Sequence, residues 1–417
     1  MSGQTENTKE VLNQARCARL EKAIALEEPD RVPFVPKTSG FYMYGYGVSH
    51  YDAMKDARNM EPGIRGFLRD YDPDAVNLGG LYSIDVMEAL GTSYIRWPGP
   101  THHLPLDSGF QQLDGTYLED DEWDEFILDP THTMITKILP RKYTKLKGLS
   151  RLYFREEYDT GFYNDLTAFA DPEVRDTLDA LIAAGKAMKE KNEQMKAVRS
   201  WIAEEGYSTY SQGTFWIPFD AFADSVRGII TAMTDMYDYP DELESAVQKV
   251  TAMNVDRMVD IYAKKGAKRI FLPLHCGGDM FMSPELFLKF YWPNLKYCLD
   301  RIIEKGMTPI CFFEGKYDMK LDIIKEVPKG KAIYMFESVD LKRAKETVGQ
   351  NACICGSIPN VMLAFGTPEQ VIEETKRQMD ILAPGGGFIM DCSLMLDNAK
   401  HENIHAWKEA TLKYGCY

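Results

Sequence analysis

Residues 269–275 read RIFLPLH, a short run of mostly apolar residues that ends at His275 and is followed by the turn CGGD. The next such run, TPICFFE at 308–314, ends at Glu314. Buried strands of a parallel sheet are short and almost continuously apolar, yet each of these runs has a polar residue at its end. The two runs therefore predict neighbouring parallel strands that bring polar side chains to one edge of a sheet.

Two later runs repeat this pattern. AIYMFESV (332–339) carries Glu337 near its end, and GFIMDCS (387–393) carries Cys392. A (β/α)8 barrel builds its active site in this way, from residues at the carboxyl ends of several parallel strands. The four runs together predict such a site near the C-terminal half of the chain.

The whole chain contains enough of these runs for a barrel. We predict eight strands: 31–37, 75–79, 213–220, 269–275, 308–314, 332–339, 352–358 and 387–393. Helical patterns lie between them, and alternating strands and helices predict a parallel sheet. The sequence therefore predicts an α/β fold, a (β/α)8 TIM barrel.

Helices and insertions complete the predicted organisation. Residues 283–306 and 367–385 each begin with a Ser or Thr followed by Pro and Glu, a pattern typical of helix N-termini. We expect a helical extension at 1–27 and, between the second and third strands, a long insertion whose residues 92–170 cover the barrel mouth. Residues 1–417, with the extension and the insertion included, are predicted to form a single domain.

Composition narrows the class of protein. The formal net charge is −15, which argues against a nucleic-acid surface, and 45% of the 417 residues are hydrophobic. The eight cysteines fall mostly in predicted strands, and the N-terminus MSGQTENTKE has no apolar signal segment. We therefore expect a cytoplasmic enzyme with reduced thiols and no membrane span.

Each candidate site residue also has a purely structural explanation. His275 is a candidate ligand or proton donor, or a hydrogen-bonded core histidine, and the turn after it carries Asp279. Glu314 is a candidate metal ligand or acid, or a partner of Lys316. Cys392 is a candidate thiolate ligand or a small buried apolar residue. Imidazole, carboxylate and thiolate together favour zinc.

At this point the chain resembles the uroporphyrinogen decarboxylase superfamily. The matching stretches occur in the family's order: EEPDRVPF (27–34), ADSVRGIITAMTDMYDYPDEL (223–243), SPELFLKFYWPNLK (283–296), SVDLKRAKETVG (338–349), CGSIPNVMLAFGTPEQV (355–371) and KHENIHAW (400–407). The resemblance implies a TIM barrel and, as is common in the superfamily, a possible homodimer.

The chain departs from the true decarboxylases at three positions. One of the arginines that grip the substrate carboxylates is replaced by Phe41. The catalytic aspartate corresponds to Tyr82, and the late histidine corresponds to a position near Leu394. The resemblance therefore favours the other branch of the superfamily, the cobamide-dependent methyltransferases.

The methyltransferase branch implies a zinc site that is altered here. Its H-x-C pair corresponds to Phe312 and Glu314, its intermediate glutamate to Glu337, and its last cysteine to within one residue of Cys392. His275 is expected to join from another strand. The implied zinc ligands are thus His275, Glu314, Glu337 and Cys392, and the candidate catalytic residues are His275, Tyr82 and Asp279.

The predicted function follows from this resemblance. We expect transfer of a methyl group from a methoxylated substrate, an aryl methyl ether, to the cobalt of a separate corrinoid protein. The leaving oxygen would be stabilised by zinc, or by a proton from His275 or a nearby tyrosine such as Tyr82. The alternatives are a methylcobamide:thiol methyltransferase of the coenzyme M type and a uroporphyrinogen decarboxylase-like decarboxylase.

Overall fold

The computed structural model describes residues 2–154 and 158–417 and has an α/β fold with a parallel sheet. Five strands lie in sequence order in this sheet, and every neighbouring pair is parallel. They are β3 (Arg269–Leu274), β4 (Thr308–Lys316), β5 (Ile333–Ser338), β6 (Cys353–Cys355) and β7 (Phe388–Ile389). The last five predicted strands are therefore confirmed, although β6 and β7 are shorter than predicted.

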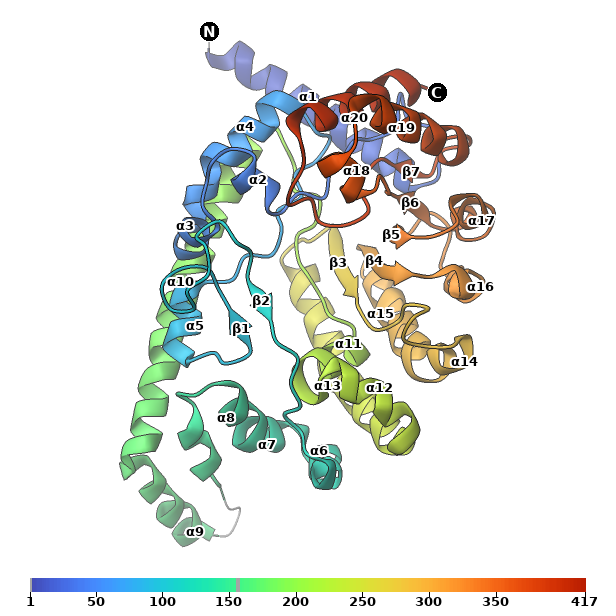
Figure 1. The fold of residues 1–417 in the computed structure, drawn as a ribbon. Coiled ribbons are helices and arrows are strands. Elements are labelled where there is room, and N and C mark those ends of the chain that lie inside the picture. The colour runs from blue at the N-terminus through green and yellow to red at the C-terminus, as the bar shows by residue number, and fades with distance from the viewer. Residues whose placement is uncertain (1, 155–157) are drawn as a thin grey trace.

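Helices follow each of these strands and lie on the outer side of the sheet (Figure 1). They are α14 (Pro284–Leu286), α15 (Trp292–Glu304), α16 (Leu321–Ile324), α17 (Leu341–Glu346), α18 (Asn360–Phe365), α19 (Pro368–Leu382) and α20 (His401–Tyr414). The helix predicted at 283–306 is interrupted by a π-helical turn, Phe287–Tyr291. Pro293 follows this turn and has no N–H to donate to the preceding turn, which explains the irregularity.

The first three predicted strands are not regular strands. Single parallel bridges join Phe34 to Met390, Val76 to Thr209, and Thr214 to Phe271. The backbone N–H of Asp74 also donates to the carbonyl of Phe34 at 2.8 Å. These short contacts place the N-terminal segments beside both ends of the five-stranded sheet.

The strand predicted at 213–220 is wrong in its second half. Residues Pro218–Phe222 form the helix α11. Pro218 stands at the start of this helix, where its fixed φ favours helical geometry and its missing N–H costs nothing. Asp220 therefore belongs to a helix that follows the third segment and not to the segment itself.

The remaining elements lie on the N-terminal side and in the region of the predicted insertion. The helices of the N-terminal part are α1 (Ser2–Ile24), α2 (Phe41–Tyr44), α3 (His50–Lys55), α4 (Glu61–Tyr71) and α5 (Ile84–Leu90). Within 92–170 lie the antiparallel strands β1 (Ile95–Arg96) and β2 (Gln111–Gln112) and the helices α6 (Trp123–Leu128), α7 (Pro130–Thr133), α8 (Leu139–Lys142) and α9 (Tyr158–Asp165). Then follow α10 (Pro172–Glu204), α12 (Ile229–Asp238) and α13 (Pro240–Lys264).

The long helix α10 runs along one edge of the molecule, next to the segments before it (Figure 1). Asp171 caps its N-terminus by accepting from the N–H of Glu173 at 2.8 Å. The apolar core lies on both faces of the sheet and under the helices that cover it. Phe34 and Trp407, for example, pack edge to face at 4.9 Å.

In the described residues, no helix is long and apolar enough to cross a membrane.

Candidate functional site

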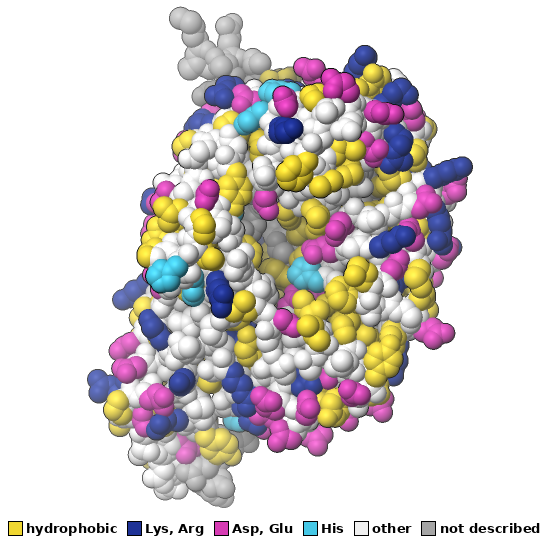
Figure 2. All heavy atoms as spheres, in the orientation of Figure 1, with side chains coloured by type: hydrophobic (Ala, Val, Ile, Leu, Met, Phe, Trp, Pro, Cys, Tyr) yellow, Lys and Arg dark blue, Asp and Glu magenta, His cyan; other side chains and the backbone are white. Residues whose placement is uncertain are grey.

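The ends of β3, β4 and β5 border a cavity of about 460 Å3, which we call the His275 cavity. Its lining residues are Gln112, Asp114, Asp224, Ile229, His275, Gly278, Met280, Phe281, Glu314, Gly315, Lys316 and Glu337. Figure 2 shows this face of the molecule hollowed at its centre, with acidic, histidine and hydrophobic side chains around the hollow. Three of the four predicted metal ligands thus come together in one cavity.

His275 lies between two carboxylates. Its Nδ1 is 2.9 Å from Oδ2 of Asp224, and its Nε2 is 3.4 Å from Oε1 of Glu314. Asp224 belongs to the π-helical turn Ala223–Arg227 that continues α11, and its Oδ1 is buried without a partner among the described residues. The imidazole is therefore held from one side by Asp224, with its Nε2 directed toward Glu314 in the cavity.

The backbone at His275 is fixed by a buried aspartate. Asp220 accepts hydrogen bonds from the N–H of His275 at 3.1 Å, from the N–H of Cys276 at 3.0 Å and from the hydroxyl of Tyr291 at 2.7 Å. Burial raises the pKa of Asp220 to about 6, although the charge of His275 opposes this. This carboxylate holds the end of β3 in position and adds negative charge near the imidazole.

The surrounding carboxylates keep His275 protonated. Burial by itself would lower the pKa of this imidazole. Hydrogen bonds to Asp224 and Glu314, together with the charges of Glu314 and Asp220, outweigh burial and raise the pKa of His275 to about 11. At neutral pH the cavity therefore contains an imidazolium, a cationic hydrogen-bond donor, and not a neutral base.

Glu337 supports the wall of the cavity next to Glu314. Its Oε2 accepts from the backbone N–H of Gly315 at 2.6 Å. Gly315 has a φ of +78°, a conformation that favours glycine, and it lies where the register between β4 and β5 shifts. Glu337 therefore helps to fix the bulge that follows Glu314.

Cys392 does not line the His275 cavity. Its thiol is buried, lies 3.2 Å from the carbonyl of Leu394 and 3.4 Å from Oδ1 of Asp391, and burial raises its pKa. Ligation of zinc by a cysteine requires its thiolate, and among the described residues no group of three or more His, Cys, Asp or Glu side chains is arranged to hold a metal ion. The predicted set of His275, Glu314, Glu337 and Cys392 therefore does not fit a zinc ion as placed, and zinc stays a prediction.

The two other predicted catalytic residues lie at the edges of this region. Asp279 accepts from the N–H of Met319 at 3.1 Å and pairs with the buried ammonium of Lys320 at 3.0 Å, so its carboxylate is occupied by the fold. Tyr82 packs edge to face on Phe110 at 4.7 Å. Burial and the charge of Asp224 raise the pKa of Tyr82, so its phenol is in the neutral form at neutral pH.

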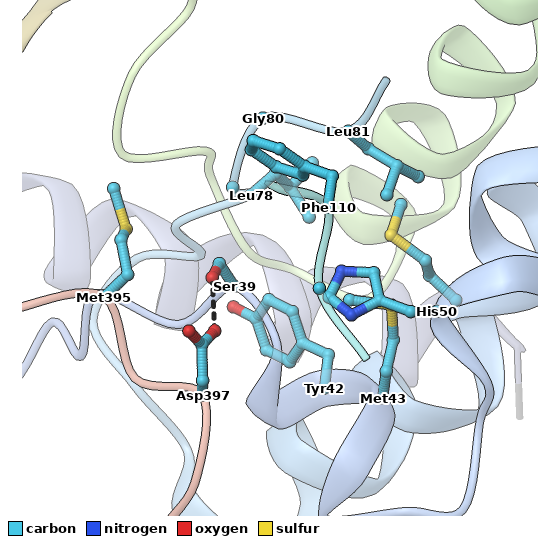
Figure 3. A pocket seen from close by; sticks show the side chains of 13 residues that line it. Ser39, Tyr42, Met43, His50, Leu78, Gly80, Leu81, Phe110, Met395 and Asp397 are labelled. Atoms are coloured by element: carbon cyan, nitrogen blue, oxygen red, sulfur yellow. Dashed lines mark hydrogen bonds between the residues drawn. The ribbon is translucent and has the colours of Figure 1, made fainter. Parts of the chain in front are cut away.

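A second, smaller cavity of about 240 Å3 lies beside the ends of the first two predicted strands (Figure 3). Its polar groups are Ser39, which donates to Asp397 at 2.9 Å, and His50, whose Nδ1 is 2.9 Å from the hydroxyl of Tyr44. Figure 3 shows Asp397 and Ser39 on one side of the cavity and His50 on the other, with Phe110 and Leu81 above them. Most of its wall is apolar, so we call it the Phe110 cavity.

Sequence reasoning missed Asp220 and Asp224 as site residues. Asp220 falls in the predicted strand 213–220, and Asp224 falls in the family stretch 223–243. The two residues nevertheless stand four apart, as residues on one face of a helix do. Pro218 before them was the available signal, since proline is common at the start of a helix. A helix that begins at Pro218 places both carboxylates on one helix at the strand ends.

Comparison with known proteins identifies the family. The model of the family described as Uroporphyrinogen decarboxylase (URO-D) matches residues 170–414, more than half of the chain. A methyltransferase from Methanosarcina mazei has a similar fold, with a TM-score of 0.61, 16% sequence identity and coverage of 95% of this chain and 98% of that chain. A search of curated protein sequences found no match. By the match to its family model, the chain belongs to the uroporphyrinogen decarboxylase family.

Proposed function

We propose that this protein is a methyltransferase that moves a methyl group from an aryl methyl ether to the cobalt of a separate corrinoid protein. The observation that carries the proposal is the position of His275, which Asp224 holds at 2.9 Å and which lines a cavity at the strand ends. Cleavage of an ether needs stabilisation of the leaving oxygen, and a fixed imidazolium supplies it. The fold shared with a methyltransferase is consistent with this reaction.

We infer that the eight predicted segments close into a barrel around this site. The support is the succession of backbone contacts: Met390 with the segment at Phe34, Phe34 with Asp74, Val76 with Thr209, and Thr214 with Phe271. These contacts connect one end of the β3–β7 sheet to the other through the N-terminal segments. A barrel gives the site one mouth, with residues 92–170 supplying Gln112 and Asp114 as a partial cover.

In this reaction the chain acts as a general acid through His275. The methyl acceptor would be the cobalt(I) form of the corrinoid, which would supply the electron pair of the new bond to the methyl carbon. The bond from the methyl carbon to the ether oxygen would break at the same time, and that oxygen would keep the electron pair of the broken bond. A proton from Nε2 of His275 neutralises the oxygen, and Asp224 stabilises the imidazolium before the transfer. No step depends on a zinc ion.

The basicity of the leaving oxygen favours an aryl ether over a simple alkyl ether. The pKa of a phenol is about 10, so a phenolate is a much better leaving group than an alkoxide. The contacts with Asp224 and Glu314 raise the pKa of His275 and make it a weak acid, which suits this less demanding leaving group. Ile229, Met280 and Phe281 give the cavity an apolar side on which an aromatic ring can lie.

The corrinoid partner would approach the same open face. Met280 and Ile230 near the cavity are 86% and 72% exposed. They offer a surface for transient contact with a protein that presents its cobalt to the site.

The test is methyl transfer from methoxybenzene derivatives to cob(I)alamin, followed by the change in absorbance as the methylated cobalamin forms. We expect activity with the intact protein and a loss of about 10²- to 10⁴-fold in His275→Gln, the usual contribution of a general acid. His132→Gln on α7, where the ring lies near Tyr153 and away from the cavity, should remain active. Demethylation unaffected by His275→Gln, or release of carbon dioxide in place of methyl transfer, would contradict the proposal.

A further inference from the structure

Lys142 is a buried lysine that reaches the turn carrying Asp224 from the region 92–170. It is the last residue of α8 and is 5% exposed. Its Nζ donates to the backbone carbonyl of Ser225 at 3.0 Å, one residue beyond Asp224. Lys142 does not line the His275 cavity, so it meets the site only through this turn.

The carboxylate of Asp224 depends on its backbone for its position. Its Oδ2 is 2.9 Å from Nδ1 of His275, and its Oδ1 is buried without a hydrogen-bond partner among the described residues. With no second hydrogen bond to hold it, the carboxylate stays directed at His275 only while the turn Ala223–Arg227 keeps its place. A displacement of about 1 Å in such a contact is enough to lower the rate of an enzyme strongly.

Two tyrosine rings hold the ammonium of Lys142 at the turn. Its Nζ lies 4.3 Å from the ring centre of Tyr94 and 5.0 Å from that of Tyr117, and an aromatic face attracts a cation at this range. The hydroxyl of Tyr94 is 3.0 Å from that of Tyr143, the residue that follows Lys142 in the chain. The two rings therefore keep the ammonium beside the carbonyl of Ser225.

The other contacts between the same region and this turn lie further along the chain. The backbone N–H groups of Tyr117 and Leu118 donate to the carbonyl of Val226 at 2.9 and 3.1 Å. Val226 is two residues beyond Asp224, whereas the carbonyl that Lys142 holds is one residue beyond it. Of these three contacts, the one made by Lys142 is thus the closest to Asp224 in the chain.

The positive charge of Lys142 is costly where it lies. Burial lowers its pKa to about 8, although the charge of Asp224 opposes this. An apolar side chain of similar length would fill the space without this desolvation cost. In residues 2–154 and 158–417 the ammonium forms no ion pair, so the fold does not use it to neutralise a contacting carboxylate. What the ammonium contributes is its hold on the turn, beside the negative charge of Asp224.

We propose that Lys142 is a positioning residue, which holds the turn Ala223–Arg227 so that Asp224 keeps His275 in the orientation needed to give up its proton. The inference rests on the proposed function for the proton transfer, whereas the contact between Asp224 and His275 can be measured without turnover. In this role the region 92–170 takes part in arranging the reacting groups and does not only cover the barrel mouth.

The NMR signal of the Nδ1 proton of His275 in isotope-labelled protein tests the proposal at neutral pH. A proton between an imidazolium and a carboxylate lies far downfield, because this hydrogen bond is charge-assisted and short. We expect the signal to be lost or to move upfield in Lys142→Met, and to persist in Lys142→Arg, whose guanidinium can donate to the same carbonyl. In Lys142→Met, kcat for methyl transfer should fall about 10- to 100-fold while KM changes less than about twofold, since Lys142 does not contact the substrate.

Lys345→Met is the matched control and should change neither the signal nor kcat. Its ammonium also donates to backbone carbonyls, those of Leu382 and Gly386 at 2.8 and 2.7 Å, but it lies on α17 and does not line the cavity. Should Lys142→Met fail to fold, Lys142→Gln, which also lacks the charge, carries the same test. An unchanged signal of His275 in the folded neutral variant would overturn the inference, as would an equal loss of the signal in Lys345→Met. Loss of the signal only in the neutral variant of Lys142, in a protein that transfers no methyl group, would support the positioning role and count against the proposed function.

Discussion

The imidazole of His275 is the residue around which the site is organised. Asp224 and Glu314 contact its two ring nitrogens, and Asp220 holds its backbone. In the low dielectric of a half-buried cavity, these charges favour the protonated ring more strongly than burial disfavours it. The same arrangement that makes His275 a strong hydrogen-bond donor makes it a poor general base at neutral pH.

Replacing Asp224 by Asn should lower the pKa of His275. The wild-type pKa of about 11 depends on the hydrogen bond to Asp224 and on the charge of Glu314, and an amide keeps the shape but not the charge. Titration of the ring by NMR with isotope-labelled histidine measures the change. Asp300→Asn, which removes an exposed partner of Lys296, should leave the titration unchanged. An unchanged pKa of His275 in Asp224→Asn would contradict this account.

The raised pKa also has a consequence for stability with a definite sign. A group whose pKa is higher in the folded than in the unfolded state stabilises the fold fully below its unfolded pKa of about 6.5. This contribution declines as the pH rises from there to the folded pKa, which is about 11. The difference in thermal stability between the intact protein and His275→Gln should therefore shrink across this range.

Cys392→Ser should leave the properties of the His275 cavity unchanged. The thiol is buried near Leu394 and Asp391, and a serine hydroxyl can make the same contacts. We expect unchanged methyl transfer and unchanged zinc content by mass spectrometry, while Glu314→Gln should reduce activity because Glu314 contacts Nε2 of His275. Loss of zinc in Cys392→Ser would show instead that Cys392 reaches the metal as predicted from the sequence.

At the scale of elements, the turn after α11 carries Asp224 and ends in a buried arginine. Arg227 is 1% exposed and forms two hydrogen bonds of 2.7 Å with Asp235 of α12. It also donates to the carbonyl of Leu118 at 2.5 Å and to Asp120 at 2.9 Å. One side chain thus ties the turn that carries Asp224 to both α12 and the region 92–170.

Arg227→Met should be strongly destabilising. Removing one partner of a buried ion pair leaves an uncompensated charge on Asp235 and costs about 3–5 kcal/mol. Urea unfolding followed by tryptophan fluorescence measures this, because Trp123 lies 4.9 Å from the guanidinium. Arg301→Met, which removes a pair at the surface with Asp256, should cost no more than about 1 kcal/mol. Similar midpoints for both variants would contradict the role given to Arg227.

The sequence predicted the elements of the second half of the molecule better than those of the first. β3, β4 and β5 are apolar along their length and pair over several residues, so their pattern is distinct. The segment 31–37 contains Pro33 and Pro36, which cannot donate to a ladder, and it makes only isolated bridges. Its position in the fold comes from tertiary contacts that no local pattern contains.

The sequence likewise predicted the site residues on regular strands better than those on helices. His275 directly follows β3, Glu314 and Glu337 lie near the ends of β4 and β5, and the structure brings all three to one cavity. Asp224 reaches the His275 cavity from a helical turn, and nothing in the local sequence tells which face of a helix meets the strand ends. Cys392 follows the short strand β7 and is turned into the interior, where it is one of several buried thiols.

At the scale of the whole molecule, the family model matches only residues 170–414, yet this part depends on the N-terminal third. The backbone of Met390 donates to the carbonyl of Pro33 at 2.8 Å and accepts from Val35 at 3.0 Å. Oδ1 of Asp391 accepts from the N–H of Lys37 at 2.6 Å. Without the N-terminal segments, the segment after β7 would present unpaired backbone groups and buried apolar side chains to water.

A fragment of residues 170–417 should therefore fail to fold cooperatively. It keeps Trp407 but loses Phe34, the ring that packs on it at 4.9 Å, and it leaves the buried Asp391 without the N–H of Lys37. We expect the fragment to bind a hydrophobic dye and to show no sharp thermal transition, whereas the full chain should show one. Co-expression with residues 1–169 as a separate chain should restore a soluble complex, since the contacts between the two parts are non-covalent. A sharp transition in the isolated fragment would show that the matched region is an independent folding unit and that residues 1–169 only add to it.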